Sequence, residues 1–285
     1  MRRMQSMMLM WSLVLSLVGV LSAQQGPINP KQVALLHWYG ANVTTTFPMS
    51  DSPTGFAYDG ANMWISQYLT NTVLKMRVSD GLLLGTFSVG HAPMGVAFDG
   101  ENIWINNYND NTVTKLRASD GHLMGTYPAG SGPVDLIFDG ANIWVTDQSP
   151  ATVTKLRASD GHLLGTYSVG SCDYPAPGGI SFDGTNLWVS NWGCGTVQEL
   201  RGSDGSGIAI FDIGGNPTGQ VFDGVNVWVA LGHGDEVVKI RASDGTLLGN
   251  YPTGEYPQQL AFDGANVWIG NRTDSDDHHW SVSKM

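Results

Sequence analysis

One run of ten residues occurs six times, lightly altered, along this chain, and it limits the possible folds more than any other feature. Its first copy, from Phe56 to Ile65, reads Phe-Ala-Tyr-Asp-Gly-Ala-Asn-Met-Trp-Ile. The copies are 40 residues apart, except for one interval of 44, as the positions of their shared aspartate show: Asp59, Asp99, Asp139, Asp183, Asp223 and Asp263. Repeats of this length that hold four short strands each are typical of the blades of a β-propeller.

Each unit divides into four β segments, which in the second unit are predicted at 94–98, 102–107, 112–119 and 123–129. Asp-Gly dipeptides separate the segments, and they supply the positive φ that a tight hairpin needs. We therefore interpret the repeated aspartates as turn residues, with catalysis or calcium binding as the alternative. The sequence predicts an all-β protein, a six-bladed β-propeller of four-stranded antiparallel blades.

A tryptophan holds the same place in every unit. The first two segments of a unit are apolar nearly throughout, as expected where neighbouring blades cover both faces of a sheet. We expect one tryptophan per blade to be buried between sheets, and a ligand-stacking ring is the alternative. The six are Trp64, Trp104, Trp144, Trp188, Trp228 and Trp268.

The two ends of the repeat region are complementary. Residues 281–285 match the third segment of a unit with no fourth segment after them, and residues 46–48 match a fourth segment without a unit of their own. Pairing this N-terminal strand with the C-terminal blade would close the ring and remove two exposed sheet edges. Residues 32–37 also resemble a third segment, so either terminus could fill that place. The predicted domains are a lead-in at 24–40 and the propeller at 41–285.

Residues 1–23 have the pattern of a secretory signal peptide. Arg2 and Arg3 precede an apolar stretch, and Ser22 and Ala23 supply small residues for cleavage. An uncleaved membrane anchor is the alternative, but the apolar stretch is shorter than the roughly 20 residues that span a bilayer. We expect a secreted or periplasmic protein with no membrane span after signal removal.

The charge balance excludes one class of partner. The chain has 14 basic and 25 acidic residues, a formal net charge of −11. Such a chain repels phosphate backbones and anionic lipid surfaces. We therefore expect no nucleic-acid partner, and we expect the single domain to be a monomer.

Two recurring motifs carry a family resemblance, namely Pro-x-Gly-Val-Ala-Phe-Asp-Gly and Asn-x-Trp followed by Val or Ile. Over residues 41–285 they resemble the YVTN and NHL-type bacterial propellers and, more loosely, the streptogramin (virginiamycin B) lyases. The resemblance implies a bacterial protein whose channel is lined by the segment after the proline. It also implies a functional face formed by the loops before that segment and by those between the second and third segments.

The resemblance to the lyases carries no catalytic residue across. In those enzymes a histidine would be expected directly after the proline of a channel segment. None of the six equivalent positions is a histidine here: they are Thr54, Met94, Val134, Gly178, Thr218 and Gln258.

Amides, hydroxyls and aromatic rings outnumber charges in the loops of the implied functional face. This mixture suits a small polar ligand, a glycan or an extracellular protein, and it equally suits a hydrated surface without a ligand. The candidate ligand-binding residues are Asn106, Asn107, Tyr108, Asp135, Asp147, Asn191, Trp192, Asn271 and Arg272.

Two carboxylates in the third unit are candidate metal ligands. Asp135 stands where four other units have glycine, and a carboxylate in the channel is costly unless it is solvated, paired or bound to a cation. Asp147 ends the next segment, and oxygen ligands of this kind suit calcium or magnesium. A calcium or magnesium site at Asp135 and Asp147 is therefore one hypothesis, and a solvated carboxylate is the other. Residues 274–280, with two adjacent histidines and three aspartates, are either a second metal site or a long polar loop.

Cys172 and Cys194 are the two cysteines of the chain. Cys172 lies in the insertion that lengthens one interval to 44 residues, and Cys194 lies in the next loop of the same face. In an exported protein this placement predicts a disulfide, with two free thiols as the alternative.

The leading functional hypothesis is a non-catalytic binding or scaffold propeller. The sequence contains no Gly-x-Ser-x-Gly, Walker or His-Glu-x-x-His motif. The alternative is a metal-assisted lyase or hydrolase, with His91 or His233 as the base and the two aspartates holding the cation. A third hypothesis is a surface or matrix protein that makes its contacts through outer-edge residues such as His122 and His162.

Overall fold

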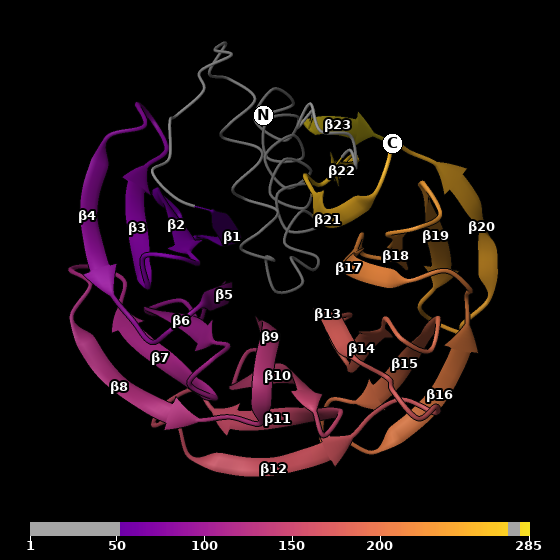
Figure 1. Ribbon diagram of the computed structural model, residues 1–285, viewed down its shortest axis with the longest axis horizontal. Coiled ribbons are helices and arrows are strands. Elements are labelled where there is room, and N and C mark those ends of the chain that lie inside the picture. Colours follow the sequence, from indigo (N-terminus) through magenta and orange to yellow (C-terminus); the bar gives the residue numbers. More distant parts are fainter. Residues whose placement is uncertain (1–51, 273–279) are drawn as a thin grey trace, which may run out of the picture.

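The computed structural model describes residues 52–272 and 280–285, in which sheets are arranged radially around a central axis (Figure 1). Several predictions lie outside these residues: the signal peptide, the lead-in, the N-terminal closing strand at 46–48 and nearly all of the loop at 274–280. No helix occurs in the described part of the chain, so none there could span a membrane.

Five blades have four antiparallel strands each, in chain order from the centre outward. Their strands are β1 (Pro53–Tyr58), β2 (Asn62–Gln67), β3 (Thr72–Arg77) and β4 (Leu83–Ser88); β5 (Pro93–Phe98), β6 (Asn102–Asn107), β7 (Thr112–Arg117) and β8 (Leu123–Pro128); β9 (Ser131–Phe138), β10 (Asn142–Ser149), β11 (Thr152–Arg157) and β12 (Leu163–Ser168); β13 (Pro177–Phe182), β14 (Asn186–Asn191), β15 (Thr196–Arg201) and β16 (Gly207–Asp212); β17 (Pro217–Phe222), β18 (Asn226–Leu231), β19 (Glu236–Arg241) and β20 (Leu247–Pro252).

The sixth blade has three described strands, β21 (Pro257–Phe262), β22 (Val267–Arg272) and β23 (Trp280–Lys284). β23 pairs antiparallel with β22, and Met285 and Val267 exchange two backbone hydrogen bonds of 2.9 Å. The C-terminus therefore supplies the third strand of the last blade, which removes the ambiguity with residues 32–37. The predicted six-bladed all-β architecture is confirmed.

The predicted strands of the second unit agree with β5 to β8 to within one residue, except at the end of β7, which was predicted two residues too long. That strand ends at Arg117 because a turn begins there. The Gly121 N–H donates to the Arg117 carbonyl (2.7 Å), and the Arg117 guanidinium bonds the Asp120 carboxylate (2.7 Å).

The repeated aspartate joins the first turn of each blade to the buried tryptophan. In blade 2, Asp99 Oδ1 accepts the backbone N–H of Asn102 (2.6 Å), and Oδ2 accepts the indole N–H of Trp104 (2.8 Å). The same indole bond measures 2.7–2.9 Å in every blade. The six aspartates are therefore turn residues, as predicted.

The tryptophans form the cores between neighbouring blades. Trp104 of blade 2 is fully buried and belongs to one cluster with Leu136, Ile143 and Leu156 of blade 3. Trp64, Trp144, Trp188 and Trp228 are buried in the same way, whereas Trp268 of the last blade is partly exposed. Burial between sheets, rather than exposure to a ligand, is confirmed for five of the six.

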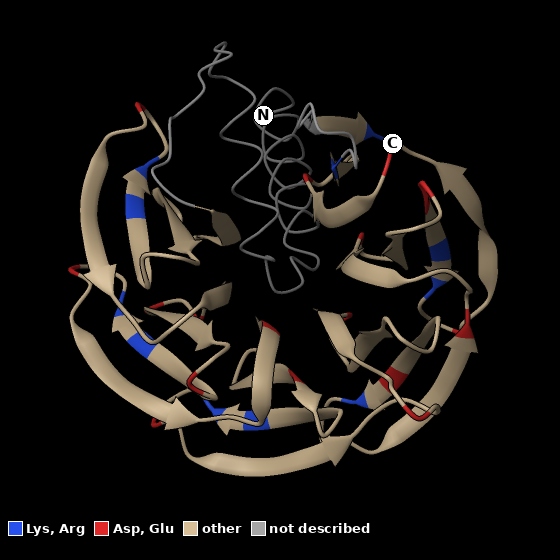
Figure 2. Cartoon of the chain, in the orientation of Figure 1, with Lys and Arg blue, Asp and Glu red and all other residues tan. Residues whose placement is uncertain are grey.

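A lysine on the third strand connects each of the first three blades to the next. Figure 2 shows Lys and Arg on these strands and many acidic residues in the turns. Lys115 Nζ lies 4.9 Å from the centre of the Trp104 ring and donates to the Ala158 carbonyl of the next blade (2.7 Å). Blade 4 has Glu199 at this position, opposite Trp188. Glu199 accepts a hydrogen bond from Asn186 (2.7 Å), and burial raises its pKa.

Replacing Glu199 with lysine should raise the free energy of unfolding by about 1 kcal/mol, because an ammonium there can contact Trp188 and the carbonyls of the Ala242–Ser243 turn. Urea denaturation at pH 7 measures the change. The reciprocal Lys155→Glu variant places a buried carboxylate where the wild type has a lysine that makes these contacts. It should have a lower free energy of unfolding. If both variants keep wild-type stability, the lysine contacts between blades contribute nothing measurable.

Candidate functional site

The loops before the first strand and after the second strand of a blade contact each other on one face. In blade 2, the Tyr108 N–H donates to the Ala92 carbonyl (3.0 Å) and the Asn109 N–H to the His91 carbonyl (3.2 Å). The Asp-Gly turns meet on the opposite face, where the Ala118 N–H donates to the main-chain carbonyl of Glu101 (3.0 Å). The predicted grouping of the loops around one mouth of the channel is confirmed.

Adjacent blades hold these mouth loops by side-chain caps. Asn111 adopts a positive φ of 57°, and its Oδ1 accepts the Gly132 N–H of the next blade (2.9 Å). Asn71 caps Ala92 and Asp235 caps Tyr256 in the same manner, each at 2.9 Å. The backbone of the mouth is therefore fixed before any ligand arrives, which lowers the entropy cost of binding.

Five of the candidate ligand-binding residues are buried and hold the loops themselves. Asn107 is typical: its Nδ2 donates to the hydroxyls of Thr112 (3.0 Å) and Thr114 (2.9 Å), and its Oδ1 accepts the Gly90 N–H (3.0 Å). All five are at most 1% exposed, so they do not present polar groups to solvent; they are Asn106, Asn107, Asp147, Asn191 and Asn271.

Asp135 lies between two blades, and its surroundings give a different reason for the glycines at its position. A Cβ on Gly55 would lie 2.1 Å from the Met94 carbonyl oxygen, so glycine there permits close approach of the neighbouring inner strand. Asp135 instead contacts β13 of the next blade: its carboxylate accepts the N–H groups of Leu136 (2.9 Å) and, in β13, of Ile180 (3.2 Å).

The hydrogen-bond partners of Asp147 differ from those of Asp135. Its Oδ2 accepts the hydroxyls of Thr154 (2.6 Å) and Thr152 (3.3 Å). Burial raises the pKa of Asp147 to about 6, although the hydrogen bonds from Thr154 and Thr152 oppose the shift. In residues 52–272 and 280–285 no group of three His, Cys, Asp or Glu side chains is placed to hold a metal. The calcium or magnesium site at Asp135 and Asp147 stays a prediction.

A polar hollow of about 430 Å³ opens on the mouth face between blades 2, 3 and 4. Across it, the Tyr108 hydroxyl donates to Gln148 Oε1 (2.9 Å). The lining is made of amides, hydroxyls and aromatic rings: Tyr108, Asn109, Asn111, Ser131, Gly132, Gln148, Ser149 and Tyr174. Tyr108 is a candidate ligand-binding residue from the sequence, and Ser131, Gln148 and Tyr174 lie in loops that the sequence assigned to this face. Asn109, Asn111 and Ser149 were missed, although their place just after a second strand was the available signal.

A histidine–aspartate pair stands beside the hollow. His91 Nδ1 lies 2.8 Å from Asp110 Oδ1, and the His91 main-chain N–H donates to Asp110 Oδ2 (2.7 Å). These two hydrogen bonds lower the pKa of Asp110, and the bond from the His91 main chain has the larger effect. Asp110 falls between Asn109 and Asn111, which line the hollow. The other candidate base, His233, lies in blade 5, where its Nε2 is 3.1 Å from the Tyr256 hydroxyl.

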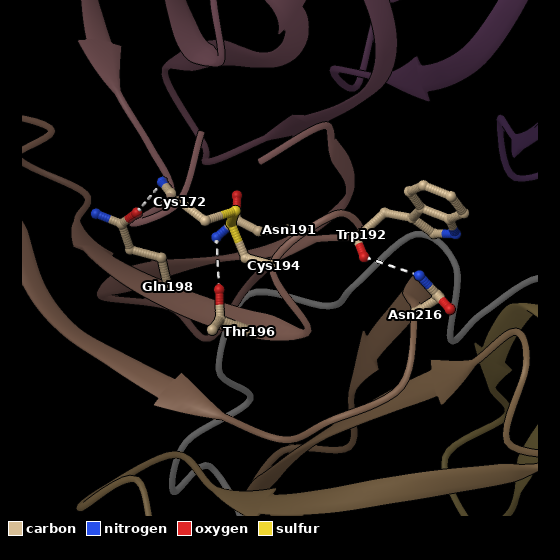
Figure 3. The surroundings of a disulfide bond; sticks show 8 residues. Cys172, Asn191, Trp192, Cys194, Thr196, Gln198 and Asn216 are labelled. Carbon is tan, nitrogen blue, oxygen red and sulfur yellow. Dashed lines mark hydrogen bonds between the residues drawn. A yellow bond between two sulfur atoms is a disulfide. The ribbon is translucent and has the colours of Figure 1, made fainter. Parts of the chain in front are cut away.

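The predicted disulfide between Cys172 and Cys194 is confirmed, with Cα atoms 5.8 Å apart. It joins the insertion before β13 to the loop after β14 (Figure 3). Trp192 in that loop is 39% exposed, and its indole points away from the disulfide. Asn216 of the next blade donates to the Trp192 carbonyl (3.1 Å). A disulfide is compatible with an extracellular location.

Removing the disulfide by the double substitution Cys172→Ala and Cys194→Ala should lower the free energy of unfolding by about 3 kcal/mol. The cysteines are 22 residues apart, and this is the loss expected when a loop of that size is no longer closed in the unfolded chain. Denaturation with and without dithiothreitol measures it. Reductant should lower the stability of the wild type and leave the double variant unchanged; equal stability of all four samples would contradict the expectation.

No family model and no curated protein matches this sequence. Many solved structures are similar to it, among them the following three. Virginiamycin B lyase from Staphylococcus aureus is 18% identical, with a TM-score of 0.67 over 82% of this chain and 85% of that one. A streptogramin B lyase is 20% identical, with a TM-score of 0.66 over 83% and 84%. A protein of unknown function from Desulfotomaculum acetoxidans is 14% identical, with a TM-score of 0.64 over 78% of each chain.

Identities this low show a common fold and nothing finer. The expected likeness to streptogramin lyases is thus confirmed for the fold, and membership of the YVTN or NHL family is not shown. The chain shares its β-propeller architecture with the streptogramin B lyases.

Proposed function

We propose that this chain is an exported, non-catalytic binding propeller that holds a polar ligand in the hollow between blades 2, 3 and 4. The observation that carries the proposal is the lining of that hollow, where neutral hydrogen-bonding groups and aromatic rings converge on loops fixed by their neighbours. Concave sites with a few fixed polar groups are the usual form of small-ligand sites.

A matched pair of tyrosines tests the proposal. Tyr108 and Tyr68 occupy the same position after the second strand of blades 2 and 1, but only Tyr108 lines the hollow. Thermal unfolding is measured with a panel of neutral sugars, polyols, amides and short peptides. A ligand that raises the Tm of the wild type should fail with Tyr108→Ala and Gln148→Ala and succeed with Tyr68→Ala. Equal responses of Tyr108→Ala and Tyr68→Ala would place the ligand elsewhere.

The second candidate function is a lyase or hydrolase, and the pairing of His91 with Asp110 favours it. A carboxylate that orients an imidazole beside a cavity is the arrangement of a general base. The test is to incubate the protein with virginiamycin B and magnesium and to follow the compound by mass spectrometry. The binding function predicts no turnover. Turnover that disappears in His91→Ala and persists in His122→Ala, a histidine of the opposite face, would establish the enzyme.

A further inference from the structure

Aromatic side chains continue the hollow around the channel mouth. Tyr174 lines the hollow and is 65% exposed. Its segment lies against the loop that carries Trp192: the Gly193 N–H donates to the Pro175 carbonyl (2.9 Å), and a Cβ on Gly193 would lie 1.9 Å from the main-chain carbonyl oxygen of Tyr174. The segment that lines the hollow through Tyr174 therefore packs directly on the loop that carries the exposed Trp192.

The series of rings extends across blades 5 and 6. The Trp192 and His233 rings are 6.4 Å apart between centroids, and the His233 and Tyr256 rings meet edge to face at 4.8 Å. The caps on the Trp192 carbonyl and on the Tyr256 N–H fix the backbone under these rings. We call this series the aromatic track: Tyr108, Tyr174, Trp192, His233 and Tyr256.

These rings are not part of the core. Five of the six repeat tryptophans are buried, whereas the side chains of Trp192 and Tyr174 are exposed to solvent. An exposed tryptophan or tyrosine offers an apolar face with a polar edge, which suits the apolar face and hydroxyl rim of a sugar ring. Amides and hydroxyls of the hollow are the matching partners for sugar hydroxyls.

Charge and length define the ligand further. The formal net charge of −11 disfavours acidic polysaccharides and single-stranded nucleic acids. At the far end of the track, the Arg272 main-chain N–H donates to the Tyr256 carbonyl (3.1 Å), which places Arg272 beside the track. Glu255 is exposed next to Tyr256, so this end of the track carries both a positive and a negative charge. A track that crosses blades 2 to 6 is longer than one sugar in the hollow requires.

We infer that the ligand is a neutral oligosaccharide of several units, anchored in the hollow and stacked along the aromatic track. The inference rests on the proposed function, because it extends the same site. A proline-rich peptide also binds aromatic grooves, but such grooves present apolar slots rather than the amides and hydroxyls found here.

Isothermal titration with cello-, xylo-, manno- and malto-oligosaccharides of one to six units tests the inference. At least one series should bind. Its affinity should rise about tenfold or more between the disaccharide and the hexasaccharide, because each further sugar unit adds contacts with the aromatic track. Trp192→Ala should lower the hexasaccharide affinity about tenfold and leave the disaccharide affinity unchanged. Trp192→Tyr should restore most of the loss, and circular dichroism checks that each variant is folded.

The outcomes separate the inference from the proposed function. Affinity that does not depend on chain length or on Trp192, but is lost in Tyr108→Ala, overturns the track and leaves the hollow as the site. Binding of no oligosaccharide overturns the inference, and the proposed function then depends on the other ligands of the thermal panel. Binding of a proline-rich decapeptide in place of every sugar also overturns it.

Discussion

Replacing Trp104 with alanine should lower the free energy of unfolding by about 3–5 kcal/mol, the usual loss for a fully buried tryptophan. The ring fills the core between blades 2 and 3, so its removal leaves a cavity shared by two sheets. It also removes the indole N–H from Asp99 Oδ2 and the contact with Tyr127, whose ring centre is 5.6 Å away. Guanidinium denaturation of the folded variant measures the loss.

Trp268 provides the matched control within the same chain. It holds the same repeat position and makes the same bond to its aspartate (2.7 Å), but it is partly exposed. Trp268→Ala should therefore cost less than Trp104→Ala, because less apolar surface is lost from the core. Equal losses would show that the indole–aspartate bond, rather than burial between blades, determines the effect.

Asp147→Asn should stabilise the protein by about 3 kcal/mol at pH 7. The carboxyl has a pKa of about 6 in the folded chain against an ordinary 3.8, and two units correspond to about 3 kcal/mol. Since the folded pKa is the higher one, the wild type is penalised only when Asp147 ionises. The gain should be small below pH 4, grow as the pH rises from 4 to 6, and stay constant above that. Urea denaturation at several pH values measures it.

Blade 2 supplies the reciprocal variant. Asn107 occupies the equivalent place and contacts two threonine hydroxyls in the same way. Asn107→Asp should lose stability over the same pH interval in which Asp147→Asn gains it. A pH-independent difference between Asp147→Asn and the wild type would mean that the Asp147 carboxyl titrates near its ordinary pKa.

The repeat made the architecture predictable because each part of it encodes a local contact. The aspartate caps a turn and accepts an indole N–H, and the tryptophan packs on the next blade, so a 40-residue period specifies the blade and its neighbour together. The disulfide was also predictable, since both cysteines fall in adjoining loops of one face. The closing strand at 46–48 falls outside the described residues and stays a prediction.

The site was less predictable because polarity does not reveal the direction of a side chain. Asn107 and Tyr108 are neighbours in a loop that the sequence placed at the mouth, yet Asn107 turns inward to two threonines while Tyr108 lines the hollow. Asn107 is the last residue of β6 and is fully buried, whereas Tyr108 follows the strand and is partly exposed. The partners of Asp135 were equally hidden in the sequence: its carboxylate accepts the backbone N–H groups of Leu136 and of Ile180 in the next blade.

Hydrogen exchange with and without a bound ligand tests the central claim most directly, because it locates the site on the ring. We expect a ligand that raises the Tm to protect amides in the mouth loops, at residues 89–92, 108–111, 131–132, 148–149 and 172–176. The Asp-Gly turns of the opposite face, such as 117–121, should exchange as in the free protein. Protection confined to those turns or to the outer strands β4, β8 and β12 would contradict the account and favour contacts through the outer edge.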